Sequence, residues 1–215
     1  MFVLNKTNSI ANHFLAELRD RNIQQDSMRF RTNLERLGGL LAYELSKSFS
    51  YRSQPVTTPL GVAHIDLIEN QPVLIPIMRA GIPFYMGVLN YFDSAGSGFI
   101  GAYRQHDGDS DDFEIQMDYV ATPSLDGRRV ILIDPMLATG KSIVKTLDAL
   151  RKNGEPDHID IMCVIAAPEG IDFLQKRIDL KFDLWIAAVD EQLNDRAYII
   201  PGLGDAGDLA FGHKS

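Results

Sequence analysis

Apolar residues in the first part of the chain recur at helical spacing. Ile10, Phe14 and Leu18 are four residues apart and therefore lie on one face of a helix. Asp26 and Ser27, both residue types that favour the start of a helix, precede a second run with the same period. That run comprises Met28, Leu34, Leu37, Leu41 and Leu45. The pattern predicts two helices ahead of any sheet.

From about residue 62 onward, short apolar runs alternate with segments of helical period. The apolar runs cover 73–77, 98–103, 129–134, 159–166 and 184–189. The helical segments between them cover 82–92, 142–152 and 170–178. Such alternation is typical of an α/β fold with a mostly parallel sheet and crossover helices. Residues 54–59, which include two prolines, are predicted to connect the helical start to the sheet.

The length and composition suit one domain. With 215 residues, of which 45% are hydrophobic, the chain can bury a sizeable core, and we expect a single domain over residues 1–215. Its longest apolar stretches, 73–78 and 161–168, are too short to span a bilayer. Polar residues follow Leu4 at once and leave no room for a signal-peptide core. We therefore expect a cytoplasmic protein with no membrane partner.

The charge balance limits the choice of partner. Acidic residues outnumber basic ones by 29 to 21, which gives a formal net charge of −8. This balance disfavours nucleic acid as a partner, because its phosphate backbone attracts basic surfaces. A small phosphate-bearing ligand is still compatible with it, since helix N-termini and backbone N–H groups attract anions locally whatever the total charge.

Residues with metal-binding chemistry are few or poorly spaced. Cys163 is the only cysteine, which excludes an internal disulfide and a cysteine-based zinc site. The acidic run 107–112 is predicted to form a mobile loop within 105–118. A calcium loop is the alternative, but Asp112 and Asp118 stand where an EF-hand needs glycine and glutamate. No paired metal spacing occurs among the histidines, which are His13, His64, His106, His158 and His213.

The segment 130–142 has the form of a phosphate site. A buried strand ends at Asp134 and leads through a loop into a helix, so that Thr139 and its neighbours present N–H groups at the positive end of that helix. An ATP-binding P-loop is disfavoured, because Pro135 stands where that loop needs glycine. In an ordinary strand-turn-helix, Gly140 would serve only the turn. Asp134, however, lies at the carboxyl end of a strand, where open α/β sheets bind ligands.

Three segments resemble the phosphoribosyltransferase family. Residues 134–142, Asp-Pro-Met-Leu-Ala-Thr-Gly-Lys-Ser, are similar to its ribose-phosphate motif in the form of the uracil-specific branch. Residues 75–81 resemble the diphosphate loop, and Tyr103-Arg104 resembles a second arginine site. Residues 198–208 resemble the uracil-binding segment. The resemblance implies a type I fold, with an open twisted sheet, N-terminal helices and a small C-terminal hood over the base.

The resemblance also implies an activity and a role for each matched residue. The reaction would transfer the phosphoribosyl group of 5-phospho-α-D-ribose 1-diphosphate (PRPP) to N1 of uracil, giving UMP and diphosphate in pyrimidine salvage. Arg79 and Arg104 would bind the diphosphate, and Asp134 the ribose hydroxyls. Asp205 would face PRPP and its metal. The 5′-phosphate cradle would comprise Ala138, Thr139, Gly140, Lys141 and Ser142. The PRPP site would also include Pro135, Met136 and Leu137, and the uracil site Ile199, Gly204, Asp205 and Ala206.

The same resemblance implies Mg²⁺ held mainly through the substrate, a homodimer or larger assembly, and GTP as an activator in some members. Structural alternatives are an ion pair for Arg79, a helix N-cap for Asp134 and a surface turn for the glycine-rich tail. Lys141 would either add charge at the phosphate or point to solvent. An RNA-binding attenuator of this fold would need a basic face, which the acidic balance opposes. Transfer to a purine or to orotate is opposed by the uracil-like tail.

Overall fold

A parallel sheet forms the centre of the computed structural model, which describes residues 1–106 and 113–213. Its strands run in the order β1-β11-β10-β8-β4-β5, and β9 pairs with β10. The strand bounds are Phe2–Val3 (β1), Val73–Pro76 (β4), Gly96–Ser97 (β5), Arg129–Ile133 (β8), Met136–Leu137 (β9), His158–Ala166 (β10) and Phe182–Val189 (β11). Each of these pairings is parallel, which confirms the predicted mostly parallel sheet.

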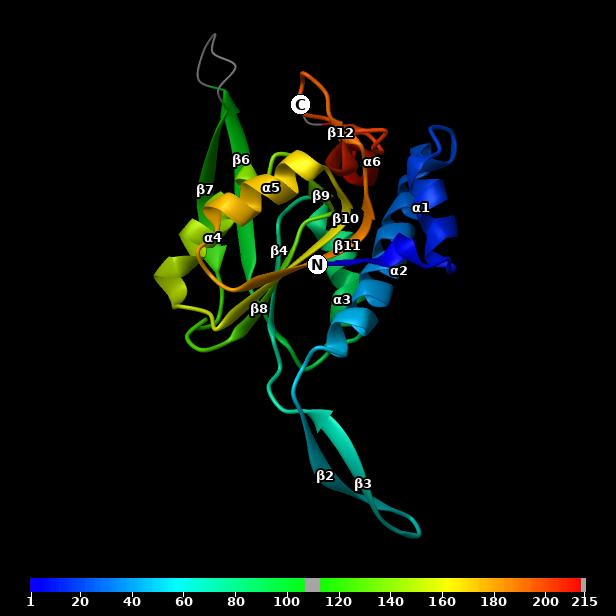
Figure 1. The fold of residues 1–215 in the computed structure, drawn as a ribbon, viewed down its shortest axis with the longest axis vertical. Coiled ribbons are helices and arrows are strands. Elements are labelled where there is room, and N and C mark those ends of the chain that lie inside the picture. The colour runs from blue at the N-terminus through cyan, green and yellow to red at the C-terminus, as the bar shows by residue number, and fades with distance from the viewer. Residues whose placement is uncertain (107–112, 214–215) are drawn as a thin grey trace.

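Helices cover both faces of the sheet (Figure 1). Residues alternate between the two faces along each strand, so Leu74 and Ile131 join one buried cluster whereas Val73 and Val130 join the other. The first cluster packs against α1 (Ala11–Arg19), α2 (Ser27–Ser46) and α3 (Gly81–Leu89), and the second against α4 (Lys141–Leu150) and α5 (Pro168–Arg177). Three short 3-10 helices are η1 (Leu4–Lys6), η2 (Ile23–Gln25) and η3 (Arg151–Asn153). None of the helices described reaches the length and apolarity that crossing a membrane requires.

The predicted N-terminal helices are confirmed. Asp26 caps α2, because its side chain accepts hydrogen bonds from the N–H groups of Met28 and Arg29. The two-residue strand β1 was not predicted, since it is too short to show a period. Cys163 is buried in β10, and burial raises the pKa of its thiol. Its burial agrees with the apolar run 159–166 in which it lies.

The predicted connector at 54–59 is wrong. Residues Tyr51–Thr58 form β2, which pairs antiparallel with β3 (Gly61–Ile68) in a hairpin that projects from the body (Figure 1). Pro55 lies opposite His64 within this ladder. A two-stranded hairpin has an open edge on each strand, and proline is tolerated there because its missing N–H need not serve the ladder. The hairpin is mostly exposed, so no buried face imposed a readable period on its sequence.

The run 98–103 was wrongly assigned to the parallel sheet, and the proposed loop 105–118 was too long. Phe99–His106 forms β6, which pairs antiparallel with β7 (Phe113–Ala121), and Ile100 of β6 forms a bridge with Ile77, the residue after β4. Alternating apolar residues from Phe113 to Tyr119 are the strand signal that the nearby acidic run obscured. The acidic run itself, 107–112, lies outside the described residues.

Candidate functional site

The predicted site residues follow strands that end at the same edge of the sheet. Cross-strand hydrogen bonds align these ends: Ile77 N–H donates to the Ile133 carbonyl at 2.9 Å, and Asp134 N–H donates to the Met162 carbonyl at 3.1 Å. Ligands of open α/β sheets bind beyond the carboxyl ends of the strands. The structure therefore brings the segments around Arg79 and Asp134 to one place.

The predicted phosphate turn is held by close packing against α5. Gly140 has φ +77°, and an added Cβ would lie 3.1 Å from both Phe173 and Leu174. An added Cβ at Gly170 would lie 2.2 Å from the Ala138 carbonyl. Lys141 begins α4 and is exposed. Because the first turn of a helix leaves N–H groups without helical partners, this end of α4 can bind an anion.

Asp134 does not cap the following helix. Gly140 occupies the N-cap position of α4, and it lies six residues after Asp134. The Asp134 carboxylate instead accepts a hydrogen bond from the Met136 N–H at 3.3 Å and is half-buried. The helix-cap alternative is therefore wrong, and the carboxylate lies at the strand end beside the phosphate turn.

Arg79 contacts the C-terminal segment. Its Nη2 lies 2.9 Å from Oδ1 of Asp208, and its Nη1 donates to the Gly212 carbonyl at 3.1 Å. His213, with Nδ1 3.0 Å from Oδ2 of Asp208, lowers the pKa of that carboxyl, and the Arg79 guanidinium lowers it further. The ion pair considered as an alternative for Arg79 is thus present. The same contact brings the arginine loop and the predicted uracil segment together.

The glycine-rich tail, residues 198–208, leads into a helix that was not predicted from the sequence. Asp205 is the N-cap of α6 (Ala206–Phe211), and its Oδ1 accepts from the N–H groups of Gly207 at 2.8 Å and Asp208 at 3.0 Å. Ala206 is buried. Ahead of the cap, Gly204 has φ +91°, a conformation that suits glycine. The tail is therefore a tight turn followed by a capped helix, and not a simple surface turn.

The remaining predicted residues are placed as follows. Arg104 lies on β6, which bridges the end of β4, and its side chain is outside the description. Ile199 is buried on β13 (Ile199–Ile200), which pairs antiparallel with β12 (Gln192–Leu193). The Leu193 N–H donates to Glu169 of α5 at 2.9 Å. This small hairpin therefore joins the tail to the helix that supports the phosphate turn.

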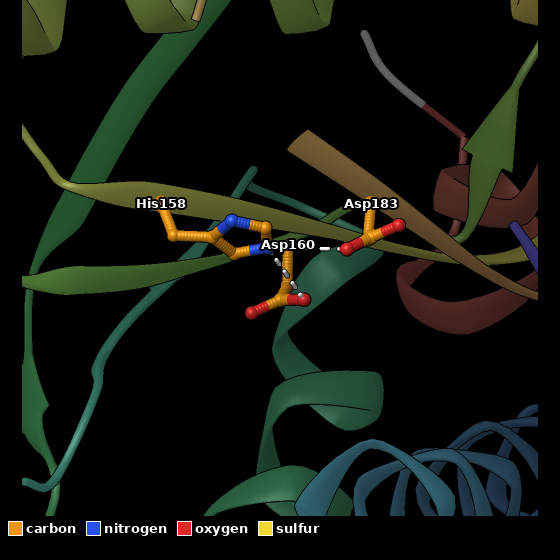
Figure 2. Close-up of side chains that lie close together, drawn as sticks. All are labelled: His158, Asp160 and Asp183. Carbon is orange, nitrogen blue, oxygen red and sulfur yellow. Dashed lines mark ion pairs between the residues drawn. The ribbon is translucent and has the colours of Figure 1, made fainter. Parts of the chain in front are cut away.

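A possible metal cluster was missed in the sequence. His158 Nε2 lies 3.5 Å from Oδ1 of Asp160 and 3.4 Å from Oδ2 of Asp183 (Figure 2). All three residues lie at the amino ends of β10 and β11, opposite the edge that carries Arg79 and Asp134. The signal was the His-x-Asp spacing at the start of β10, which becomes informative only once β11 is paired beside it.

Arg129 makes this cluster a poor cation site. The buried Asp160 carboxylate accepts from Arg129 Nε at 2.6 Å and Nη2 at 3.0 Å, and from Trp185 Nε1 at 2.8 Å. Burial alone would raise the pKa of Asp160, but the neighbouring His158 and Arg129 outweigh it and lower that pKa. A guanidinium already neutralises this carboxylate, so the cluster is an internal ion-pair network.

A depression of about 260 Å³ lies beside α1 and the carboxyl end of β11, and none of its lining residues comes from the segments around Arg79 and Asp134. It is lined by Asn5, Asn12, Leu15, Ala16, Arg19 and Ala188. None of these residues is among the predicted ligand contacts. One of them, Arg19, also donates a hydrogen bond to the Gly202 carbonyl in the tail.

A mostly parallel sheet with helices on both faces, a turn that leads from Asp134 into α4 and an arginine loop after β4 that contacts the C-terminal tail are features of a type I phosphoribosyltransferase. A model of the family described as "Uracil phosphoribosyltransferase" matches residues 5–213. The chain belongs to the uracil phosphoribosyltransferase family.

Individual relatives agree with this assignment. The uracil phosphoribosyltransferase of Porphyromonas gingivalis is 43% identical over 98% of this chain and 97% of its own. That of Pyrococcus furiosus is 38% identical over 92% of this chain and 84% of its own. The solved structure of the AQ2163 protein from Aquifex aeolicus has a TM-score of 0.85 and 32% identity, and covers 96% of both chains.

Proposed function

We propose that this protein, acting as a single domain in the cytoplasm, transfers the phosphoribosyl group of PRPP to N1 of uracil and releases diphosphate. The observation that carries the proposal is the contact between Arg79 and Asp208. It joins the loop assigned to the diphosphate with the segment assigned to the base, beside the strand end of Asp134. One edge of the sheet can thereby receive a sugar phosphate and a pyrimidine together.

Charge control is the main task of the proposed site. The 5′-phosphate binds at the start of α4, where backbone N–H groups of residues 138–142 and the helix dipole favour an anion. Asp134 accepts hydrogen bonds from the ribose 2′ and 3′ hydroxyls. As diphosphate leaves C1′, positive charge develops on the sugar and negative charge on the leaving group. Arg79 and Arg104 stabilise the leaving group, since guanidinium stays charged and presents paired donors.

The base lies against the tail in this proposal. Uracil has an edge of alternating carbonyl and N–H groups, which main-chain groups can recognise. We assign this recognition to Ile199, Gly204 and Ala206. The positive φ of Gly204 and the small side chain of Ala206 allow the backbone to approach a flat ring closely. N1 of uracil then attacks C1′ from the face opposite the departing diphosphate.

We propose that magnesium enters the site bound to PRPP and is held mainly by the substrate. When bound, it neutralises diphosphate charge and makes the group a better leaving group. Asp205 is exposed at the edge of the site, and hard carboxylate oxygens suit this ion or its water ligands. The cluster of His158, Asp160 and Asp183 is not assigned to it, because Arg129 already pairs with Asp160.

The hairpin β2–β3 supports the proposed homo-oligomer. It projects from the body (Figure 1), and its exposed apolar residues include Leu60 at 99%, Val62 at 63% and Ile65 at 46%. Apolar surface of this kind is typical of an interface. Ile65 and Leu67 share one face of β3, so the double substitution Ile65→Glu/Leu67→Glu should yield monomers in sedimentation velocity. An unchanged sedimentation coefficient would remove the hairpin from the assembly.

An activity assay tests the reaction directly. Purified protein with PRPP and Mg²⁺ should release diphosphate in a uracil-dependent manner and form UMP. Hypoxanthine and orotate serve as competing acceptors, and activity with either of them in place of uracil would contradict the proposal. Adding GTP to the same assay tests the proposed activation, and chelation of Mg²⁺ should abolish turnover.

A further inference from the structure

An ion pair outside the proposed ligand contacts supports the segment between Ile199 and Gly204, which is assigned to uracil recognition. Arg19 ends α1, and Asp190 follows β11. Their Nη1–Oδ2 distance is 2.8 Å and their Nη2–Oδ1 distance is 2.5 Å. The Asp190 side chain is 4% exposed and that of Arg19 is 25% exposed. A bidentate pair so sheltered from water fixes geometry far better than a surface pair does.

The same pair holds both polar groups of Gly202. The Gly202 N–H donates to Oδ2 of Asp190 at 2.8 Å, and its carbonyl accepts from Nη1 of Arg19 at 3.0 Å. Gly202 has φ +62°, and an added Cβ would lie 2.1 Å from the Ile199 carbonyl. The chain therefore turns sharply here, with its orientation set by two charged side chains.

Asp190 is itself anchored to the sheet. Its N–H donates to the Ala166 carbonyl at 2.8 Å, which fixes it at the ends of β10 and β11. The next residue, Glu191, donates its N–H to the Ile200 carbonyl at 3.0 Å. Gly202 thus has a defined position relative to the sheet edge that carries Asp134.

We propose that Arg19 and Asp190 are positioning residues for uracil recognition, which orient the main chain between Ile199 and Gly204 without touching substrate. This inference rests on the proposed base site. Main-chain groups can discriminate a base only if their directions are fixed. Without the pair, the turn at Gly202 can relax, and uracil binding weakens. PRPP binding persists, because its assigned contacts at α4, Arg79 and Asp134 lie outside the segment between Ile199 and Gly204.

Steady-state kinetics of Arg19→Met and Asp190→Asn test the inference. Each variant should raise the KM for uracil by about tenfold or more, as expected for the loss of charge-assisted hydrogen bonds. The KM for PRPP should change by less than about twofold, since the lost bonds hold only the base segment. Arg29→Met is the matched control, because it removes a bidentate pair with Glu17 between α1 and α2. That control should leave the KM for uracil unchanged.

A second variant guards against failure to fold. Arg19→Met/Asp190→Leu leaves no lone buried charge, so it should fold even where a single variant does not. Folding is checked by thermal unfolding, and the raised KM for uracil should persist. Folded variants with an unchanged KM for uracil, or with equal rises for both substrates, would overturn the inference.

Ala206→Val separates this inference from the base site on which it rests. The substitution alters a residue assigned to uracil directly. If it raises the KM for uracil and the Arg19 and Asp190 variants do not, the positioning role fails and the base site stands. If none of the variants raises it, both are wrong.

Discussion

Arg79 and Asp208 are joined by an ion pair of 2.9 Å although 129 residues separate them in the chain. Through this pair, α6 holds Arg79, the residue proposed to bind diphosphate. Diphosphate carries more negative charge than one carboxylate, so it can displace Asp208 from the guanidinium. Binding of PRPP is therefore expected to loosen the contact between the arginine loop and the tail.

Arg79→Ala should lower turnover by at least about tenfold, because the leaving diphosphate loses a fixed pair of charged donors. Initial rates at saturating PRPP and uracil measure the effect. Arg151→Ala is the control, since Arg151 pairs with Asp179 on the surface away from the site. Equal rates for the wild-type protein and Arg79→Ala would remove Arg79 from the site.

Asp205 has two roles that substitution can separate. Asp205→Ala should lower turnover by at least about tenfold through the loss of charge and stability by about 1 kcal/mol through the loss of the N-cap. Asp205→Ser keeps a capping oxygen without the charge. It should therefore unfold like the wild-type protein while turning over slowly. Full activity of Asp205→Ser would show that Asp205 only caps α6.

Gly140→Ala should weaken PRPP binding. The glycine has φ +77°, and its Cβ position is crowded by Phe173 and Leu174 at 3.1 Å, so the phosphate turn must shift. The KM for PRPP is expected to rise by about tenfold. Gly127→Ala is the control, because Gly127 has φ +63° but its nearest contact is 4.0 Å away, at the opposite edge of the sheet. A similar rise in the KM for PRPP in both variants would show that backbone strain alone, without movement of the phosphate turn, is responsible.

Stability should fall in acid partly through Glu17. Hydrogen bonds from Arg29 and then Asn33 lower the pKa of Glu17 from 4.5 to about 2. A carboxyl with a lowered folded-state pKa contributes stability above its unfolded pKa and loses it as pH falls through the folded pKa. Between about pH 4.5 and pH 2, Glu17→Gln should therefore lose less stability than the wild-type protein in chemical unfolding. Equal losses of unfolding free energy in Glu17→Gln and the wild-type protein over that range would contradict the lowered pKa of Glu17.

Local patterns in the sequence were enough to predict the core of the fold and the strand-turn-helix from β8 to α4. The apolar run that ends at Asp134 predicted β8, and the helical period after Gly140 predicted α4. The hairpin β2–β3 escaped because its strands are mostly exposed and have no buried face. The Arg79–Asp208 and Arg19–Asp190 pairs could not be predicted from local pattern either, since each depends on elements more than a hundred residues apart.

The most direct test of the account is a crystal structure with UMP bound. The account predicts the phosphate at the N–H groups of residues 138–142, the ribose hydroxyls on Asp134, and the uracil edge on the main chain of Ile199, Gly204 and Ala206. A base bound away from the tail, or a phosphate bound elsewhere than the start of α4, would contradict it.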